Sequence, residues 1–353
     1  MKIITINQGH TDNYGDIAIN EAISSIFDGE DVRFFPFWEE SVVYGRLAKH
    51  RYLKALVVRM PVITEFLNNR RINKSLANIV ADAAIIGGGE LLSAHKGFNL
   101  SLYAWVAALK KRGIPVYIIG VSGNDDLKKR QFARNRKAIE MANEVIVRDG
   151  YTKKIFADYY DKEVECAPDV VFCAYSGKNS STDKRLRNRI VLCPIEPSRR
   201  IIKALALKNI DEYIDYCIEI SVEEMNDQCS ELVVAPTVKT DSAIAEKIFN
   251  KAKERRINVK YISYSNLNKF RKVLENTSVV VSARMHGMIL GLNMGCKIKP
   301  IRFKQKLITF GEEYGNIGDS KQVSQKARAA LKKVKLQIMK GNTLKEVCQE
   351  TKN

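Results

Sequence analysis

Residues 278–287, SVVVSARMHG, decide the fold class of this chain. Three consecutive valines without polar alternation are typical of a strand that is buried on both faces. An apolar helical pattern over residues 288–294 follows directly, after a turn that carries an Arg and a His. A buried strand that leads straight into a helix indicates a parallel sheet with helices on both faces.

The same succession of strand and helix recurs along most of the chain. Residues 81–89, ADAAIIGGG, are again a buried strand that runs into glycines. A polar stretch over residues 176–188 interrupts the alternation and is the best linker candidate. The expected strands are Lys2–Ile6, Ala81–Ile86, Pro115–Gly120, Glu144–Val147, Ile190–Pro194, Glu231–Ala235, Val259–Ser263, Ser278–Ser282 and Lys297–Phe303, and the expected helices are Ile17–Phe27, Leu100–Arg112, Leu127–Ala142, Asp211–Asp227, Asp241–Arg255, Leu267–Glu275 and Met288–Met294.

This alternation predicts two Rossmann-like, doubly wound α/β domains. The first spans residues 1–180 and carries a basic helical insertion at about 44–75. The second spans residues 181–318, and a basic helical tail covers residues 319–353. Two such domains normally hold a ligand in the cleft between them, at the carboxyl ends of their strands.

The composition of the 353 residues is that of an ordinary globular protein, with 45% hydrophobic and 28% charged residues. It excludes a disordered chain, a collagen-like repeat and a disulfide-dense mini-protein. No run reaches the roughly 18 apolar residues of a membrane span, and the first residues lack the pattern of a secretory signal. We therefore expect a cytoplasmic protein.

The excess positive charge is concentrated in two segments. The chain carries 58 Lys+Arg against 40 Asp+Glu, a net charge of +18, and residues 41–80 and 321–353 each contribute +7. Both segments have helical apolar spacing. They could attract an anionic surface, such as phospholipid headgroups, a lipid-linked diphosphate or an acidic glycan, or they could be solvated helix faces. No nucleic-acid-binding signature accompanies them, so nucleic acid is not an expected partner.

The cysteines and histidines do not indicate a metal site. The seven cysteines are odd in number and none has C-x-x-C spacing, which is typical of reduced, buried thiols. The four histidines lie far from paired cysteines, and no carboxylate cluster suggests a metal. We expect no metal and no cofactor.

Three groups of polar or glycine residues lie at predicted strand ends. Residues 13–16, NYGD, follow the first strand and open a helix, where they could bind an anion or simply form a turn and N-cap. The glycines of residues 87–89 would allow a ligand to approach the backbone closely. Arg148 could point its guanidinium at a phosphate or carboxylate, or pair with Asp149 or a nearby surface acid. The residues singled out in the first two groups are Asn13, Gly15, Asp16, Gly88, Gly89 and Glu90.

The fourth group is the most informative. Arg284 and His286 follow the strand at 278–282, and Lys304 and Lys306 follow the next strand. Adjacent strand ends would then collect two or three cations and an imidazole, which suits a small, multiply charged anion and a proton transfer near neutral pH. A solvated basic edge with a core histidine is the alternative.

In this order the motifs resemble those of the polysaccharide pyruvyl transferase family. The resemblance covers about residues 3–316, and the ordered set is more specific than any one motif. The family commonly has Tyr-Asp-Pro-Lys where this chain has residues 303–306, FKQK. The matching features are Asn13 to Asp16, Gly87 to Gly89, Val147-Arg148-Asp149, Pro168-Asp169, Ser282 to Gly287, Gly295, Phe303 and Lys306.

The resemblance implies a fold like that of the GT-B glycosyltransferases, with an acceptor-side first domain and a donor-side second domain. It implies phosphoenolpyruvate as donor, a sugar with two neighbouring hydroxyls as acceptor, and a cyclic pyruvate ketal as product. Arg148, His286 and Lys306 are then the expected donor-site residues. Residues 13–16 and 88–90 would line the cleft and the acceptor site.

The chemistry of these residues agrees with that reaction. His286 is our candidate for the general acid or base. Arg284 and Lys306 would stabilise the negative charge on the departing phosphate, and Arg284 would also bind the donor. Asp16, from the opposite domain, could take a proton from the acceptor hydroxyl. The acceptor could be lipid-linked or polymeric, with peripheral contact at the inner face of an anionic membrane, and a homo-oligomer is compatible with the sequence.

Two other functions fit parts of the same evidence. A GT-B glycosyltransferase would use a similar architecture and cationic site for a nucleotide sugar. A non-catalytic protein could bind anionic glycan or lipid through the basic segments alone, and its binding would collapse with salt and would not depend on His286.

Overall fold

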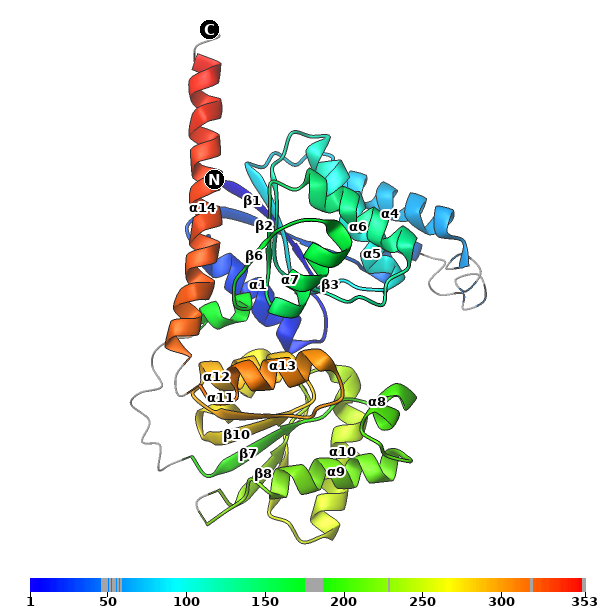
Figure 1. Cartoon of the computed structure of the whole chain (residues 1–353), viewed down its shortest axis with the longest axis vertical. Helices are drawn as coiled ribbons and strands as arrows, with labels where there is room; N and C mark the ends of the chain where they lie inside the picture. Colours follow the sequence, from blue (N-terminus) through cyan, green and yellow to red (C-terminus); the bar gives the residue numbers. More distant parts are fainter. Residues whose placement is uncertain are drawn as a thin grey trace. The chain divides into compact units, whose positions relative to one another are not determined.

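The structure is a computed structural model that describes residues 1–45, 59–174, 187–227, 229–317 and 320–350, together with residues 50, 52, 55 and 57, and side chains up to residue 342. The described chain forms two compact units, which we describe separately (Figure 1). Unit 1 comprises residues 1–10 and 19–170 and the chain from residue 326 onward, and unit 2 comprises residues 11–18 and 171–325.

Unit 1 is built on a six-stranded parallel sheet of order β2-β1-β3-β4-β5-β6. Its central strands β1, β3 and β4 are buried along nearly their whole length, as expected for a sheet with helices on both faces. The strands are β1 (Lys2–Asn7), β2 (Asp31–Pro36), β3 (Ala83–Leu92), β4 (Val116–Gly123), β5 (Glu144–Val147) and β6 (Glu165–Cys166).

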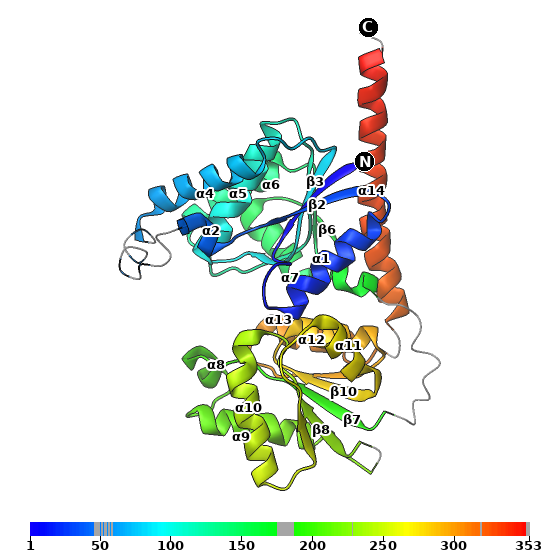
Figure 2. The same ribbon diagram turned by 180° about the vertical axis from the view of Figure 1, so that it is seen from behind.

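Helices cover both faces of this sheet. Helices α4, α5 and α6 lie on one face, and α1 and α14 lie on the other, as both views show (Figures 1 and 2). On the first face, Ile4, Ile6 and Ile86 pack with Trp105 of α5 in one apolar core. The helices are α1 (Tyr14–Ile26), α2 (Glu40–Tyr44), α4 (Pro61–Ser75), α5 (Lys96–Lys110), α6 (Lys129–Met141), α7 (Gly150–Ile155), a π-helical turn (Phe156–Tyr160) and α14 (Lys321–Glu350).

Unit 2 is a five-stranded parallel sheet of order β11-β10-β7-β8-β9. Val279 and Val281 of the stretch that decides the fold pack in its core with Ile190 and Leu192 of β7. The strands are β7 (Arg189–Cys193), β8 (Glu231–Val234), β9 (Val259–Tyr261), β10 (Thr277–Ser282) and β11 (Lys297–Pro300), and the helices are α8 (Arg199–Ala204), α9 (Ile210–Val222), α10 (Ser242–Glu254), α11 (Leu267–Glu275), α12 (Met285–Asn293) and α13 (Gln305–Tyr314).

The two units differ from the predicted domains in three places. Residues 11–18 group with unit 2, because Asn13 forms a β-bridge with Val238 and Tyr14 N–H donates to the Thr237 carbonyl. The predicted tail is part of unit 1 from residue 326, and the division near residue 180 falls at residue 170 instead. Most of the predicted linker, residues 175–186, and much of the basic insertion lie outside the described residues.

The contact of the predicted tail with unit 1 has an electrostatic part. Lys333 of α14 bonds Glu144 at 2.7 Å and Glu165 at 2.5 Å. These two acids are the first residues of the neighbouring strands β5 and β6. Lys335 donates to the Ile26 carbonyl at the end of α1. The helix therefore continues unit 1 rather than forming a separate tail.

The glycine run of residues 87–89 also differs from its prediction, since it lies inside β3 and not in a loop after the strand. Gly87 pairs with Ile119 and Gly89 with Val121 of β4. A β-carbon at Gly87 would overlap the Ile119 carbonyl oxygen, and one at Gly88 would overlap the Ile19 side chain of α1. Gly87 therefore allows the close approach of β4, and Gly88 allows the close packing of α1, which explains both glycines without a ligand.

Candidate active site

The sheet order of unit 2 places one switch point at the carboxyl ends of β7 and β10. From β7 the chain moves to β8 and β9 on one side of the sheet, and then to β10 and β11 on the other. The loops that follow β7 and β10 therefore lead away from each other, and open α/β sheets bind their ligands at this point. Arg284 and His286 follow β10 directly.

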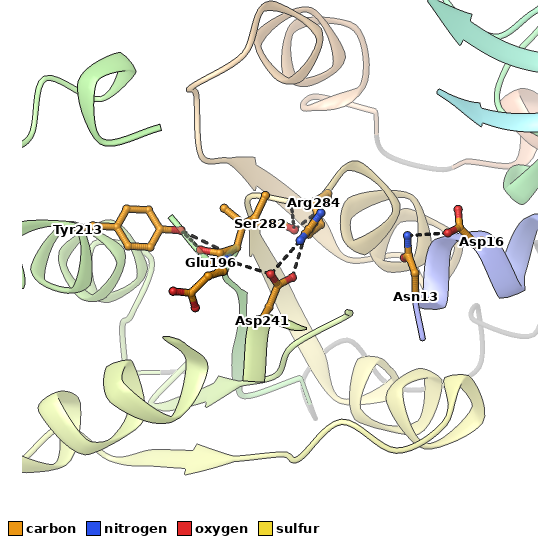
Figure 3. A network of polar contacts seen from close by, with 8 residues as sticks. Asn13, Asp16, Glu196, Tyr213, Asp241, Ser282 and Arg284 are labelled. Atoms are coloured by element: carbon orange, nitrogen blue, oxygen red, sulfur yellow. Dashed lines mark hydrogen bonds and ion pairs between the residues drawn. The ribbon is translucent and has the colours of Figure 1, made fainter. Parts of the chain in front are cut away.

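Arg284 is fixed at this edge by a buried carboxylate. Its Nε and Nη2 atoms donate to the two carboxylate oxygens of Asp241, at 2.9 and 2.8 Å (Figure 3). Asp241 is fully buried, whereas the Arg284 side chain is 30% exposed. Asp241 also accepts a bond from the Glu196 backbone N–H in the loop after β7. One carboxylate thus joins three strand ends and holds the guanidinium plane in place.

The backbone around Arg284 is set by its own strand. Ser282 Oγ accepts a hydrogen bond from Arg284 N–H at 3.0 Å and donates to the Arg284 carbonyl at 2.8 Å. Arg284 has extended dihedral angles and is the N-cap residue of α12. This turn places Met285 and His286 in the first turn of the helix, where the helix dipole favours anions.

The NYGD segment lies in the same unit as these residues. Asn13 Oδ1 accepts from Gly15 N–H at 2.9 Å, which forms the turn that opens α1. The Asp16 carboxylate accepts from Asn13 Nδ2 at 3.0 Å and from Thr11 Oγ1 at 2.8 Å. Asp16 therefore holds the turn together, as the turn and N-cap interpretation expected.

Tyr14 anchors this turn to the carboxyl edge of unit 2. Its ring stacks on Tyr264 with centroids 4.6 Å apart, and its hydroxyl accepts from Ser265 N–H at 2.9 Å. Burial raises the pKa of the Tyr14 hydroxyl. The segment is thereby fastened to the loops that follow β8 and β9.

Gly15 lies directly against His286. A β-carbon at Gly15 would overlap Nδ1, Cγ and Cβ of the imidazole, so only glycine allows this approach. The two residues are far apart in sequence, and their contact sets the position of the ring beside the start of α1. The structure therefore brings together Asn13, Gly15, Asp16, Arg284 and His286.

Lys306 follows the adjacent strand at a greater distance along the chain than predicted, because β11 ends at Pro300 rather than at Phe303. It is in the first turn of α13, after β11, which pairs with β10 in the sheet. Removal from water lowers the pKa of its ammonium group to about 8. A half-buried lysine at this edge gains from the arrival of an anion, because an anion restores its charged form.

Arg148 occupies a different environment, in unit 1. Its side chain is 3% exposed, and Nη1 bonds Asp169 at 2.8 Å while Nη2 bonds Ser122 Oγ at 2.6 Å. The guanidinium faces these partners rather than solvent. Its Nε also lies 3.9 Å from the carboxylate of Asp149, the partner that the alternative named, but its main partner Asp169 is buried and is not the expected surface acid. This buried ion pair joins two of the motifs that carry the family resemblance, V-R-D and P-D.

The remaining predicted acceptor residues also lie in unit 1, around the carboxyl half of β3. Gly88 and Gly89 have positive φ angles of 78° and 87° and are part of the strand. Glu90 accepts a hydrogen bond from Asn124 Nδ2 at 2.7 Å, beside the end of β4. These contacts place Glu90 next to the end of β4.

Asp241 and Tyr264 are the functional-site residues that sequence reasoning missed. Asp241 stands at the start of a predicted helix, where an acid is read as an ordinary N-cap. Its position after a strand, in APTVKTD, was the available signal, because residues after parallel strands share one edge. Nothing in the sequence near Tyr264 indicates that it stacks on Tyr14.

The described part of the chain shows neither a metal-binding cluster nor a helix that could span a membrane. No group of three or more His, Cys, Asp or Glu there is arranged to hold a metal ion. No described helix is both long and apolar enough to cross a membrane.

Comparison with known proteins gives a family and a fold. The model of the polysaccharide pyruvyl transferase family matches residues 13–298, most of the chain. No curated protein sequence matches. Among solved structures, UDP-GlcNAc 2-epimerase from Neisseria meningitidis bound to UDP-GlcNAc has a TM-score of 0.56 at 12% identity, over 96% of this chain and 100% of that one.

Two further epimerase structures give the same picture. UDP-GlcNAc 2-epimerase from Methanocaldococcus jannaschii has a TM-score of 0.54 at 10% identity, covering 95% of this chain and 100% of that one. UDP-N-acetylglucosamine 2-epimerase from Rickettsia bellii has a TM-score of 0.53 at 12% identity, covering 96% of each chain. At such low identity the likeness concerns the fold alone, and it confirms the predicted GT-B-type architecture of two Rossmann-like units with parallel sheets.

Proposed function

Since this chain belongs to the polysaccharide pyruvyl transferase family, we propose that it transfers pyruvate from phosphoenolpyruvate to a sugar diol and forms a cyclic ketal. The observation that carries this proposal is the edge of unit 2, where Arg284 and His286 follow β10 and Lys306 follows β11. A guanidinium, an imidazole and a desolvated ammonium at neighbouring strand ends suit a small dianion and a proton transfer.

The charges at this edge match those of phosphoenolpyruvate, which carries a carboxylate and a phosphate. Arginine has five N–H donors, and the bonds to Asp241 use two of them. Asp241 also neutralises part of the Arg284 charge, so Lys306 supplies the remaining attraction. An anion bound there would favour the protonated lysine.

The first step needs a proton donor for the methylene carbon and an acceptor for the hydroxyl proton, and one group can serve as both. In the proposed sequence the first sugar hydroxyl attacks the central carbon of phosphoenolpyruvate while the methylene carbon takes up a proton. The phosphate then leaves, and the second hydroxyl closes the ketal and loses its proton to solvent or to the departing phosphate. His286 accepts the proton of the first hydroxyl and supplies the one for the methylene carbon.

Asp16 and Arg148 enter this proposal as positioning residues. Asp16 holds the turn at residues 11–16, and that turn carries Gly15 against His286. Arg148 holds Asp169 beside the ends of β4 and β5 in unit 1. Arg148 is buried against its partners, so we assign it no direct chemistry. The half-buried Asp16 stays our candidate for a base at the acceptor hydroxyl.

The proposal includes the substrate partners and the place of action. The family implies a sugar or polysaccharide as acceptor. Phosphoenolpyruvate is a metabolite of the cytoplasm, and we place the enzyme there, without a metal or cofactor.

The decisive experiment measures phosphate release from phosphoenolpyruvate with a panel of sugar diols, together with thermal shifts by phosphoenolpyruvate, inorganic phosphate and UDP-sugars. We expect stabilisation by phosphoenolpyruvate that is lost in Arg284→Ala and kept in Arg271→Ala, a matched arginine on α11. His286→Asn should lower turnover by about 10²-fold or more and leave the thermal shift in place.

Two results would overturn the proposal. One is stabilisation and turnover with a nucleotide sugar but none with phosphoenolpyruvate, which would make the protein a glycosyltransferase or epimerase. The other is turnover of phosphoenolpyruvate that survives in His286→Asn, which would remove the imidazole from the mechanism.

A further inference from the structure

Helix α4 (Pro61–Ser75) presents to solvent a face that is apolar at one end and cationic at the other. Val62 is 79% exposed and Phe66 is 62% exposed, and Ile63 lies beside them at 38%. At 100° per residue these three side chains share an arc of about 120° with Arg70 and Lys74, which follow in the next turns. We call this arc the outer face of α4; Figures 1 and 2 show the helix at the edge of its unit.

The inner face of the same helix is mixed, because the buried Ile72 lies there together with two polar side chains. Thr64 and Asn68 are buried there, and Asn68 Nδ2 donates to Ser101 Oγ of α5 at 3.3 Å. Thr64 Oγ1 donates to the Met60 carbonyl at 3.2 Å. Ile72 packs in the apolar core of unit 1, whereas Val62, Ile63 and Phe66 face water. Folding alone does not explain that exposed apolar cluster.

The charge around the outer face is positive, and the described part of the chain offers its cations no acidic partner. Residues 41–80 carry a net charge of +7, the densest positive segment together with residues 321–353. No described residue forms an ion pair with Arg70 or Lys74. In α14, by contrast, Lys333 and Lys335 pair with acids of unit 1.

We propose that the outer face of α4 docks on the surface of a bilayer that contains anionic phospholipid. Val62, Ile63 and Phe66 would enter the region between headgroups and acyl chains, and Arg70 and Lys74 would lie among the phosphates. Helices that lie in a membrane surface combine aromatic and aliphatic side chains with flanking Lys and Arg in this way. Each cation near an anionic surface contributes about a fivefold gain in binding, and the apolar side chains add a term that salt does not screen.

This inference goes beyond the proposed reaction, because it concerns where the enzyme works and does not depend on the donor. It favours a lipid-linked sugar as acceptor over a soluble one. A neutral apolar partner protein would explain the exposed Phe66 but not the unpaired cations, and a second copy of the chain would bring two faces of the same charge together.

The test is co-sedimentation of the full chain with vesicles of phosphatidylcholine, with and without phosphatidylglycerol, at low and high salt. We expect binding to vesicles that contain phosphatidylglycerol and little binding to phosphatidylcholine alone. The pair Val62→Ser and Phe66→Ser should weaken binding by roughly tenfold or more at both salt concentrations. The pair Arg70→Gln and Lys74→Gln should weaken it by roughly 20-fold at low salt and by less at high salt.

Matched variants separate this face from general basicity. The double variant Lys247→Gln, Lys253→Gln removes two cations from α10, and the variant Val80→Ser removes an exposed valine. Both variants should bind the vesicles as the unchanged protein does. Phosphate release with a soluble acceptor should be unaltered in all of these variants, so a failure of the reaction and a failure of docking are distinguishable.

Three outcomes would overturn the inference. The first is that no vesicle binds the unchanged protein, or that phosphatidylcholine alone binds it equally well. The second is undiminished binding by the Val62→Ser, Phe66→Ser pair while Lys326→Gln with Arg328→Gln abolishes it, which would assign binding to α14. The third is a concentration-dependent dimer that disappears in the Val62→Ser, Phe66→Ser pair, which would make the outer face a contact between copies.

Discussion

The guanidinium of Arg284 donates two hydrogen bonds to the carboxylate of Asp241, at 2.9 and 2.8 Å. The carboxylate is fully buried and the guanidinium is partly exposed. An arginine held in this way is oriented before any ligand arrives, so little conformational freedom is lost on binding. The pair therefore links the packing of unit 2 to the chemistry at its edge.

Breaking this pair should affect stability cooperatively. Asp241→Asn should lower the free energy of unfolding by roughly 2 kcal/mol, less than the value for a fully buried pair, because Arg284 is 30% exposed. Arg284→Met should lower it by about as much, and the double variant by clearly less than the sum. Urea denaturation of the four proteins measures the coupling.

The control for this cycle is a second Arg–Asp pair. Arg255 Nη2 lies 2.6 Å from Asp215 Oδ1, and the two side chains are 34% and 37% exposed. Asp215→Asn should therefore lower the free energy of unfolding by less than about 1 kcal/mol. Additive effects at Arg284 and Asp241 would show that the contact carries no energy.

Gly15→Ala should displace the His286 imidazole, because a β-carbon at Gly15 overlaps the ring. We expect kcat for phosphate release to fall by about 10²-fold and stability to fall by about 1–3 kcal/mol. Gly150→Ala is the matched control, since no atom lies within 4 Å of its added β-carbon. Unchanged kcat in Gly15→Ala would separate the position of the ring from the reaction.

Lys306 should give phosphoenolpyruvate binding an alkaline limit. The folded protein holds the lysine proton with a pKa of about 8, so the ammonium form dominates below that pH and is lost as the pH rises through it. The contribution of Lys306 to the affinity for phosphoenolpyruvate should therefore be full below about pH 8 and decline above it, and binding above that pH should take up protons. Calorimetry in buffers of different ionisation enthalpy measures this uptake.

Two variants test the assignment of that limit. Lys306→Arg keeps its charge at every accessible pH and should move the limit upward, whereas Lys306→Met should remove it and weaken binding at all pH values. Lys272→Met, on α11, should leave the profile unchanged. A limit that persists in Lys306→Met would belong to another group.

Arg148 should prove important for stability rather than for donor affinity. Arg148→Met leaves the buried Asp169 carboxylate without its charged partner and should lower the free energy of unfolding by about 3–5 kcal/mol. Arg148→Met with Asp169→Leu should recover part of that loss. The KM for phosphoenolpyruvate of the folded variants should change by less than about threefold, and a stable Arg148→Met that no longer binds the donor would contradict this.

Gly88 should tolerate alanine much less well than another glycine with a similar backbone. Gly88 and Gly113 have φ angles of 78° and 70°, but only Gly88 has a neighbour, Ile19, in the space of an added β-carbon. Gly88→Ala should therefore destabilise by about 1–3 kcal/mol more than Gly113→Ala. Ile19→Ala should reduce that difference, as thermal and urea denaturation can measure.

The sequence was most informative where local patterns decide the outcome. The expected helix at Leu267–Glu275 and the expected strand at Glu144–Val147 agree with the structure residue for residue. The strand at 278–282 is one residue longer. Strand β2 (Asp31–Pro36) was not expected, because it is a half-exposed edge strand whose pattern, DVRFFP, lacks a buried apolar run.

By itself, then, the sequence determined the parallel α/β class, the family motifs, the placement of Arg284 and His286 after a strand end, and the two basic segments. These depend on periodicity and local composition. Only the tertiary structure decided which groups pair: Arg284 with Asp241, Arg148 with Asp169, and Gly15 with His286. The physical reason is that such contacts join loops that are distant in sequence, and the order and packing of the strands, rather than any local pattern, bring those loops to one edge of a sheet.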